Sequence, residues 1–411
     1  MKLPSVSLGT AVAAATVGIA FAVVVIGSIS VSMSNQDRVI MGVQSNGTTL
    51  AGMTKKEVHT FFEKTAQNKL NHKAAILTYQ NRSWEIQAKD INLQANIDDA
   101  TDAAYQVGRS SSLPVNLLIQ LKCAMFGTKI DLTGRYDENL LEQKLQQVQK
   151  EIHSDPVNAS AQLLANGSIK KTAAVIGLTL DIDPVKASLD PQLKALALTI
   201  RTPLSPAEEP PFVTDDDLAS IDGVLGSYTT RFSPGDRGDN IGLAASQLQG
   251  ALVRSQSTLS FNNIVGHRTR SAGYKNAGVI VDGEPAIDVG GGVCQVSSTL
   301  YNAILLAGMK PTERSNHALP SSYVPRGRDA TVADDLLDLV FQNPLPHPVY
   351  LRVANTGSSL TIYVLGTRAD LAGKTITLVT GGSYAHPSLY RVWKENGQIV
   401  DREFMHTDSY S

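Results

Sequence analysis

The 411-residue chain has little net charge and almost no cysteine. Its 36 Lys and Arg residues nearly balance 38 Asp and Glu residues, which gives a formal net charge of -2 at pH 7. Without an excess of positive charge the chain has no long-range field that attracts nucleic acid, so DNA and RNA are excluded as principal partners. The two cysteines, Cys123 and Cys294, are too few for a disulfide framework. The length predicts two or three domains.

The N-terminal segment lacks charge altogether from Leu3 to Gln36. Within it, Ala11–Val31 consists of apolar and small residues and is long enough to cross the ~30 Å hydrocarbon layer at about 1.5 Å per residue. We therefore predict a transmembrane anchor over residues 11–32. Ser30-Val31-Ser32 resembles a cleavage site, which leaves a cleaved signal peptide as the alternative.

The charge at the N-terminus predicts the orientation of the anchor. Lys2 and the α-amino group favour a cytoplasmic tip over residues 1–10. The expected location is the cell membrane, in a single pass, with the bulk of the chain extracytoplasmic. Thiols tend to oxidise outside the membrane. A disulfide between Cys123 and Cys294 is accordingly one open interpretation.

The first half after the anchor predicts an α+β module over residues 38–201, built as two similar repeats. Thr54 and Glu57 form a capping-box pattern ahead of an amphipathic helix, and a hairpin follows that turns at Asn81-Arg82. A second strand, helix and hairpin follow, with a turn at Asn166-Gly167. Four prolines then predict a semi-extended linker over residues 202–214.

The second half predicts a mixed α+β domain over residues 221–366 and a β-appendage over residues 367–411. The segment Pro348–Gly366 alternates like a β-hairpin that turns at Asn355-Thr356-Gly357. Another hairpin is expected in the tail, with Asn396-Gly397 at its tip. The fold class predicted for the chain is therefore α+β.

The segment "DVGGGVCQVSSTLYNA" places Cys294 directly after three glycines and at the start of a helical pattern. Glycines allow positive φ and close backbone approach. The unpaired amides at a helix N-terminus carry about half a positive charge, which favours a thiolate. Cys294 is thus a candidate nucleophile. It can equally be a small buried hydrophobe, or the disulfide partner of Cys123.

A nucleophilic cysteine needs a base, and the base benefits from an orienting group. His317 and then Asp329 follow Cys294 in the chain, and Asp329 opens a stretch with strand character. The order Cys on a helix, then His and Asp on neighbouring strands, is that of transglutaminase-like thiol enzymes. The alternatives are a loop histidine that bonds to the backbone and an aspartate that serves a turn or cap.

Several polar residues are candidates for substrate binding. Gln295, Ser297 and Ser298 could donate to substrate, although polar residues at helix starts also act as caps. Basic side chains cluster on either side of the cysteine and could grip carboxylates, with Arg231 and Arg268 the foremost candidates; the others are Arg237, Arg254, Arg270, Lys275, Arg314, Arg326 and Arg328. No phosphate-loop pattern or zinc-ligand spacing is present, so no cofactor or metal is predicted.

The blocks around Cys294 resemble the VanW family, named for an accessory protein of bacterial glycopeptide-resistance clusters. They run in order from about Leu225 to Tyr363: "TTRF", "DNIGLAASQLQG", "LSFNNIVGHRT", "GYKNAGVIVDG", "GGGVCQVSSTLYNAILLAG", "ERSNH", "YVPRGRDATV" and "DLVFQNP". The chain departs from the family pattern at "SQSTLSFN", where a proline-glycine-glutamate run is usual.

Residues 38–201 resemble the peptidoglycan-binding domain that often precedes VanW. Together the resemblances imply a membrane-anchored cell-envelope protein whose partners are peptidoglycan or its stem peptides. They do not supply a reaction, so the proposal of catalysis by Cys294, His317 and Asp329 rests on residue chemistry. Three interpretations stay open: a wall-binding accessory protein, a cysteine-dependent hydrolase or acyltransferase, and a scaffold in which Cys294 is structural or bonded to Cys123.

Overall fold

The computed structural model describes residues 37–198, 200–281 and 284–410, and it is a mixed α+β structure as predicted. The chain divides into two compact units. Unit 1 contains the described residues up to Ser154 together with Leu178–Glu208, and unit 2 contains Asp155–Gly177 and the chain from Glu209 onward. Within the described residues no helix has the length and apolar content needed to cross a bilayer. The anchor predicted over residues 11–32 lies outside them.

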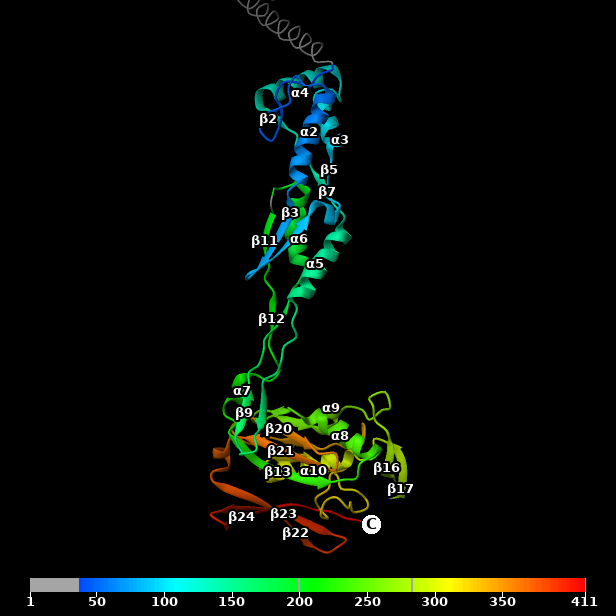
Figure 1. Cartoon of the computed structure of the whole chain (residues 1–411), viewed down its shortest axis with the longest axis vertical. Coiled ribbons are helices and arrows are strands. Elements are labelled where there is room, and N and C mark those ends of the chain that lie inside the picture. The colour runs from blue at the N-terminus through cyan, green and yellow to red at the C-terminus, as the bar shows by residue number, and fades with distance from the viewer. Residues whose placement is uncertain (1–36, 199, 282–283, 411) are drawn as a thin grey trace, which may run out of the picture. The chain divides into compact units, whose positions relative to one another are not determined.

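The first core of unit 1 gathers three helices around a small sheet (Figure 1). Its elements are β1 (Val43–Ser45), β2 (Thr48–Thr49), α2 (Lys55–Leu70), α3 (Ile97–Gln106), α4 (Leu113–Phe126) and β6 (Thr128–Lys129). The capping box predicted from Thr54 and Glu57 is confirmed, since each side chain accepts from the other's backbone N–H. One face of α2 buries Val58, Phe62 and Ala66 against this core.

The second core of unit 1 lies between a three-stranded sheet and two helices. The sheet has the order β11–β3–β4, from β3 (Lys73–Tyr79), β4 (Arg82–Gln87) and β11 (Ile200–Pro203). The helices are α5 (Glu138–Ile152) and α6 (Asp183–Lys194), and both contribute buried leucines. The smaller elements are η1 (Ala88–Ile91), β5 (Gln94–Ala95) and β7 (Gly134–Arg135). The predicted hairpin β3–β4 is present, but its turn is Gln80-Asn81, one residue earlier than predicted, because Arg82 already pairs with Tyr79. Gln80 has a φ of 50° in this turn.

The structure partitions the middle of the chain differently from the predicted domain limits. The hairpin β8 (Ser160–Leu163) and β9 (Ile169–Thr172) belongs to unit 2, although the sequence grouped it with the first module. The expected linker contains two strands, because β11 pairs in parallel with β3 and β12 (Ala207–Glu209) pairs with β10 (Gly177–Thr179). Proline at the end of β11 is compatible with pairing because that strand lies at the edge of its sheet.

Unit 2 is built around one buried helix, α10 (Val293–Leu306). The helix packs on a four-stranded sheet of order β13–β21–β20–β14 (Figure 1). These strands are β13 (Gly223–Arg231), β14 (Leu252–Val253), β20 (Val349–Asn355) and β21 (Ser359–Gly366). The predicted hairpin β20–β21 is confirmed, with Gly357 at φ 82° in its turn.

Short elements surround α10 and connect the sheet strands. They are α7 (Asp215–Ala219), α8 (Asp236–Leu248), β15 (Thr258–Ser260), α9 (Phe261–Val265), β16 (Asn276–Val281), β17 (Glu284–Val289), β18 (Lys310–Glu313) and β19 (Val340–Gln342). The helix α8 buries Ile241, Ala244 and Leu248 in the same core as α10.

The C-terminal segment forms a three-stranded sheet that is part of the unit 2 core. It consists of η2 (Arg368–Leu371), β22 (Lys374–Gly382), β23 (Pro387–Glu395) and β24 (Gln398–Thr407). The predicted turn at Asn396-Gly397 is confirmed by positive φ at both residues. Leu389 is fully buried in the core with α10, and the Arg391 guanidinium donates to the Met309 carbonyl at 2.6 Å. The C-terminal segment, which the sequence predicts to be a β-appendage, is therefore part of the unit 2 core.

The close contact between β13 and α10 predicts that a methyl group added at Gly226 destabilises unit 2. A Cβ at Gly226 would lie 2.5 Å from the Ala307 nitrogen and 2.7 Å from the Ala303 carbonyl oxygen. Gly226→Ala should lower the free energy of unfolding of unit 2 by about 1–3 kcal/mol through overpacking. Trp84 and Trp393 are the two tryptophans, so urea unfolding followed by fluorescence in a Trp84→Phe background reports on unit 2.

Gly278 is the matched control for this substitution. A Cβ at Gly278 meets no atom within 4 Å. Gly278→Ala should therefore change the free energy of unfolding by less than about 0.5 kcal/mol. Equal losses in the two variants would contradict the close approach of β13 to α10.

Candidate active site

The three glycines before Cys294 each serve a backbone requirement. Gly290 and Gly292 have φ of 83° and 112°, a region that L side chains rarely adopt. Gly291 has no room for a side chain, because a Cβ there would lie 2.6 Å from the Ala277 carbonyl. The tight turn delivers the chain into α10 with Gly292 as the N-cap. Cys294 is thus the second residue of the helix, as the sequence predicts.

Cys294 is the exception on an otherwise buried helix. Every other residue of α10 from Val293 to Leu305 is buried, and Cys294 alone in that stretch is partly exposed. A helix that is apolar and buried all round belongs to the core. The turn therefore places Cys294, the one partly exposed residue of this stretch, at the positive end of a helix, where a thiolate is stabilised.

His317 and Asp329 meet beside Cys294. The His317 Nδ1 lies 2.6 Å from Asp329 Oδ2, and the His317 backbone N–H donates to the same oxygen at 2.7 Å. The imidazole also lies close enough to the Cys294 sulfur for each group to shift the other's pKa. Because Nδ1 is held by Asp329, the other ring nitrogen, Nε2, is the one that can face the sulfur. The structure thus brings together all three residues that the sequence singled out for catalysis.

The two segments that carry His317 and Asp329 are irregular rather than regular strands. An isolated bridge between Ser315 and Thr331 holds them side by side. The prediction that they lie on neighbouring strands is therefore met only by this single bridge. The side chains of Ser297 and Ser298 on α10 reinforce the arrangement, since both donate to the Ala330 carbonyl.

The electrostatics favour a thiolate–imidazolium pair. Burial raises the pKa of the Cys294 thiol, but the hydrogen bond and charge of His317, with Val332 and Arg268, outweigh burial and lower it. Burial lowers the pKa of His317, but Asp329 and Cys294 raise it to about 9. The positive charge on His317 therefore stabilises the folded state fully below about pH 6.5, and this contribution is lost as the pH rises through about 9. The imidazole is therefore charged at neutral pH.

Asp329 sits in a buried charge cluster of which the sequence gives little sign. Its side chain is 1% exposed, and it accepts from the Tyr410 hydroxyl at 2.5 Å and from Arg314 at 3.3 Å. Arg314 in turn pairs with Asp408. Burial raises the pKa of Asp329, but these partners and His317 hold it below its usual range. Asp329 therefore remains a carboxylate that can orient His317.

Tyr323 closes the other side of the imidazole. Its ring lies edge-on to His317 with 6.5 Å between ring centroids. Burial raises the pKa of Tyr323, so the phenol is neutral. Tyr323, Asp408 and Tyr410 were not among the sequence candidates. The fold brings these residues to the site from segments that lie after α10 in the chain.

The two cysteines are both free thiols. Cys123 is 2% exposed in the first core of unit 1. The structure thus gives no support to the disulfide interpretation. Within the described part of the chain, no group of three His, Cys, Asp or Glu side chains could hold a metal ion.

Comparison with known families identifies two regions. Residues 236–365 match the family described as "VanW like protein", and residues 84–200 match the one described as "Putative peptidoglycan binding domain". Unit 2 carries a VanW-like domain. Cys294, His317 and Asp329 all lie inside the first match, whereas Asp408 and Tyr410 lie beyond its end. The tail that supports Asp329 is therefore additional to the matched domain.

Two known proteins are similar to this chain over part of its length. "Uncharacterized protein YoaR" of Bacillus subtilis is 45% identical over 155 residues, which is 37% of this chain and 51% of YoaR. "Vancomycin B-type resistance protein VanW" of Enterococcus faecalis is 27% identical over 183 residues, which is 41% of this chain and 66% of that protein. The chain thus spans between half and two thirds of these relatives. No solved structure matches the chain.

The polar residues at the start of the VanW-like helix are engaged within the protein. Gln295 is buried, donates to the Arg231 carbonyl at 2.9 Å and accepts from Arg237 at 3.2 Å. Ser297 and Ser298 are fully buried and donate to backbone carbonyls. These bonds fix α10 to its surroundings. Substrate binding by the three residues stays a prediction.

The basic residues of the VanW-like domain are largely paired with acidic or backbone groups. Arg268 has a side chain 8% exposed, pairs with Asp334 and donates to Asn262 at 2.6 Å. Arg231 is exposed at the end of β13. Arg268 is near enough to Cys294 to lower the thiol pKa, so it contributes to the site electrostatically. The pairs of the others are Arg237 with Gln295, Arg254 with Asp217, Arg270 with Asn276, Lys275 with Asp239, Arg314 with Asp408, Arg326 with Tyr384 and Arg328 with Leu378.

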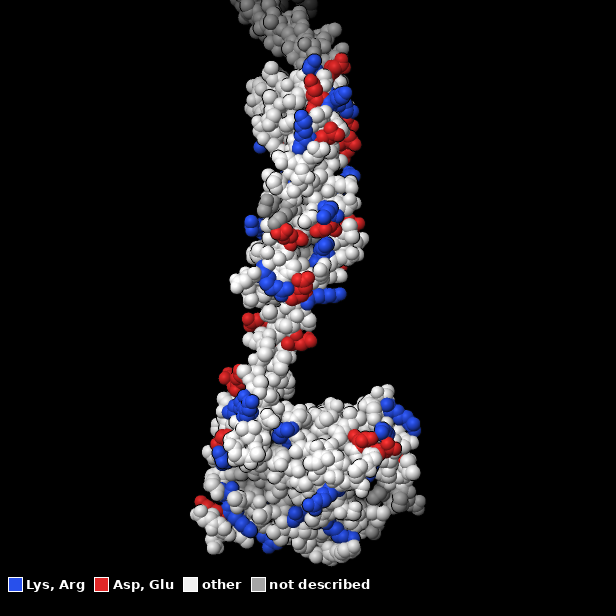
Figure 2. All heavy atoms as spheres, viewed as in Figure 1, with Lys and Arg blue, Asp and Glu red and all other residues white. Residues whose placement is uncertain are grey.

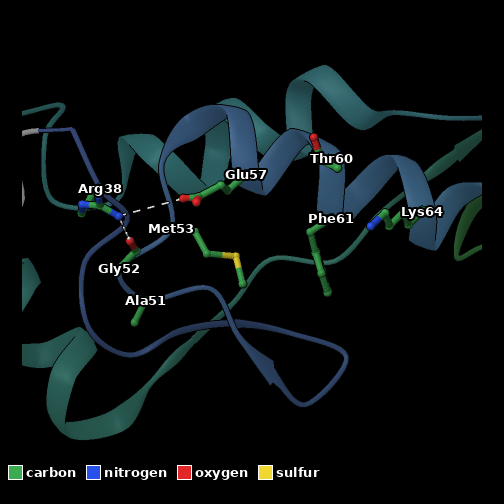
Figure 3. A pocket seen from close by; sticks show the side chains of 8 residues that line it. All are labelled: Arg38, Ala51, Gly52, Met53, Glu57, Thr60, Phe61 and Lys64. Atoms are coloured by element: carbon green, nitrogen blue, oxygen red, sulfur yellow. Dashed lines mark hydrogen bonds and ion pairs between the residues drawn. The ribbon is translucent and has the colours of Figure 1, made fainter.

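A pocket of about 470 Å³ lies in unit 1, outside the VanW-like domain (Figure 3). It is lined by Arg38, Ala51, Gly52, Met53, Glu57, Thr60, Phe61 and Lys64. The Arg38 guanidinium donates to the Gly52 carbonyl at 2.8 Å and approaches Glu57 at 4.0 Å. The pocket precedes the region matched to peptidoglycan binding, which begins at residue 84.

The buried cluster predicts a pH-dependent contribution to stability. Burial raises the pKa of Asp408, but His406 and Arg314 lower it to about 2. A depressed pKa stabilises the folded state above about pH 4, and the effect is lost as pH falls through about 2. Asp408→Asn should therefore lower the free energy of unfolding of unit 2 by about 2 kcal/mol or more at pH 7, since it also leaves Arg314 without a buried partner.

The matched control is Asp401→Asn on the exposed part of β24. It should change the free energy of unfolding by less than about 0.5 kcal/mol. The difference between the parent and Asp408→Asn, measured by Trp393 fluorescence in the Trp84→Phe background, should shrink between pH 4 and pH 2. A difference that is absent at pH 7, or that does not change with pH, would contradict the assignment.

Proposed function

We propose that the protein is a membrane-anchored cell-envelope protein that binds peptidoglycan and transfers an acyl group of wall peptide through Cys294. The assembled Cys294–His317–Asp329 triad at the start of α10 carries the proposal. The two family matches support association with the cell wall. Membrane attachment through residues 11–32 is the sequence-based part of the proposal.

The proposed reaction has two balanced halves. The Cys294 thiolate attacks an amide or ester carbonyl, and the resulting oxyanion collapses to a thioester as the leaving amine or alcohol takes the His317 proton. Water or a second amine then attacks the thioester, gives its proton to His317 and releases the Cys294 thiolate. Water gives hydrolysis, and an amine gives transpeptidation. Asp329 holds His317 in the orientation that both halves need.

The backbone at the helix start supplies a donor for the oxyanion. The N–H groups of Val293 and Gln295 donate to the carbonyls of Gly290 and Gly292. We assign the N–H of Cys294 itself, at the positive end of α10, as the donor to the oxyanion. A fixed N–H donor stabilises the negative charge that develops in the transition state most strongly where the site is largely shielded from water.

Unit 1 supplies the proposed grip on the wall. The matched region, residues 84–200, covers most of the second core of unit 1 and part of the first, together with the segment Asp155–Gly177 of unit 2. Vancomycin resistance appears in the name of one relative, so we take wall stem peptide as the substrate class to test first. The extracytoplasmic location would place both units on the side of the membrane where peptidoglycan lies.

A non-catalytic scaffold is the second candidate function. The internal hydrogen bonds of Gln295, Ser297 and Ser298 favour it, because they leave these side chains little capacity to bind substrate. In this interpretation the glycine turn and α10 would be a packing device. The two candidates differ in what happens when the sulfur atom is removed.

Removal of the sulfur should abolish acyl transfer and leave wall binding intact. Purified protein incubated with muropeptide digests should gain a thioester-linked mass at Cys294 and release a new product. Cys294→Ala should lose at least about a thousandfold in turnover. Binding to isolated wall sacculi should be unchanged, because unit 1 is untouched.

Cys123→Ala is the matched control, since Cys123 is buried in the other unit. It should keep both turnover and wall binding. Turnover that survives Cys294→Ala would contradict acyl transfer by this thiol. Wall binding without any turnover in the parent protein would favour the scaffold.

A further inference from the structure

The helix α4 in unit 1 exposes its large apolar side chains. The exposed fractions run from 44% for Val115 to 76% for Phe126. The exposed set is Leu113, Val115, Leu118, Leu121, Met125 and Phe126. At 100° per residue all but Leu113 fall on one continuous face of the helix, interrupted by Lys122. Scattered exposed leucines are ordinary, but a contiguous face of this kind marks an interaction surface.

The uncharged polar residues of α4, Asn116 and Gln120, lie on the other side of the helix. Gln120 donates to the Gly108 carbonyl at 3.0 Å, and Asn116 bonds to Ser111 through both its oxygen and its nitrogen. Cys123 is the one fully buried residue of the helix. A helix on the surface of a soluble domain has the opposite arrangement, with its apolar stripe toward the core. The orientation of α4 is therefore adapted to an apolar environment outside the domain.

The helix α4 lies next to the start of the described chain. A Cβ at Gly42 would lie 2.0 Å from the Cys123 carbonyl oxygen, so the residue before β1 is in close contact with α4. The strand after α4 pairs in parallel with β1, with Val43 opposite Thr128. Met41, just before this contact, is 67% exposed. The uncharged run Ala11–Val31 ends a short stretch upstream.

The charged residues in the chain segment that contains α4 are all basic. No Asp or Glu occurs between Asp102 and Asp131, whereas Lys122 and Lys129 are exposed there. In the space-filling view most of the surface over α4 and β2 carries neither acidic nor basic atoms (Figure 2). An apolar face bordered by lysine suits the boundary between acyl chains and anionic headgroups.

We propose that α4 docks in the outer surface of the lipid bilayer, parallel to it, with the face that contains Leu118, Leu121 and Met125 in the headgroup–acyl boundary. The inference rests on the membrane attachment proposed above. The apolar segment would bring the chain to the bilayer, and α4 lies against the first described residues after that segment. Docking would add a second point of attachment and fix how unit 1 stands on the membrane.

The test uses the full-length chain in vesicles of phosphatidylcholine and phosphatidylglycerol. In a Cys294→Ser background, Leu118→Cys is labelled with the environment-sensitive fluorophore NBD. Cys123 is buried, and the background protein without Leu118→Cys checks that it stays unlabelled. Leu198→Cys is the matched control, because Leu198 is a leucine of unit 1 with a similar exposure, 59% against 66%. Flotation after an alkaline carbonate wash first establishes that the chain is held by the vesicles.

Docking predicts that the probe at Leu118 emits at shorter wavelength and loses fluorescence to lipids spin-labelled near the headgroup. The probe at Leu198 should be quenched by aqueous iodide and not by lipid. Iodide quenching at both positions would place α4 in water and overturn the proposal. A blue-shifted probe at Leu118 that neither quencher reaches would mean that protein covers the face, either a second copy or residues 11–31, and would overturn it as well.

These readouts are independent of the proposed chemistry and of wall binding. Failure of the chain to float would count against the anchor as well as against docking. Flotation combined with a water-exposed Leu118 would count against docking alone. Loss of muropeptide turnover would bear on Cys294 and leave the position of α4 unaffected.

Discussion

The bond between His317 and Asp329 is the interaction on which the proposed site depends. A buried carboxylate is costly unless it is paired and hydrogen-bonded, and Asp329 has both kinds of partner. The carboxylate fixes the imidazole and, together with Cys294, raises its pKa to about 9, and the imidazolium in turn lowers the pKa of the Cys294 thiol. Asp329 thus acts on the sulfur through His317.

The rest of unit 2 serves to hold this chain of charges in place. The glycine turn positions the sulfur, the serines of α10 bind the backbone beside Asp329, and the C-terminal sheet brings Asp408 and Tyr410 into the cluster. Buried ion pairs contribute little net stability, because desolvation offsets attraction. Their contribution here is to fix geometry. That is consistent with a site that needs a defined imidazole orientation.

The local features of the sequence predict much of the structure. The capping box at Thr54, the turns at Gly357 and Asn396-Gly397, and the start of α10 after three glycines are all found where periodicity and turn chemistry place them. Such features depend on neighbours in the chain, so a single sequence contains the information for them. The three candidate catalytic residues were also identified by residue type and order.

The features that the sequence did not predict depend on contacts between distant segments. Tyr410 lies 81 positions from Asp329 and Asp408 lies 94 from Arg314, and nothing local marks them as partners. The hairpin β8–β9 joins unit 2 through buried contacts with Tyr350 and Leu365, which outweigh its position in the chain. The outward-facing leucines of α4 become significant only when burial shows which side of the helix meets the protein. Most of the guanidinium groups that the sequence offered for substrate binding also bind nearby acids and carbonyls, which no local pattern predicts, and substrate binding by Arg231 and Arg268 stays a prediction.

The most direct test of the account is the pH dependence of alkylation of Cys294 by iodoacetamide, measured in a Cys123→Ala background with and without His317→Ala. A thiolate–imidazolium pair predicts that the alkylation rate has its pH midpoint clearly below the ordinary thiol value of about 8.5. It also predicts that this midpoint shifts upward, toward or beyond that value, when the imidazole is removed. A midpoint at or above the ordinary value that does not respond to His317→Ala would contradict the thiolate–imidazolium pair, and α10 would then be a structural helix whose second residue happens to be cysteine.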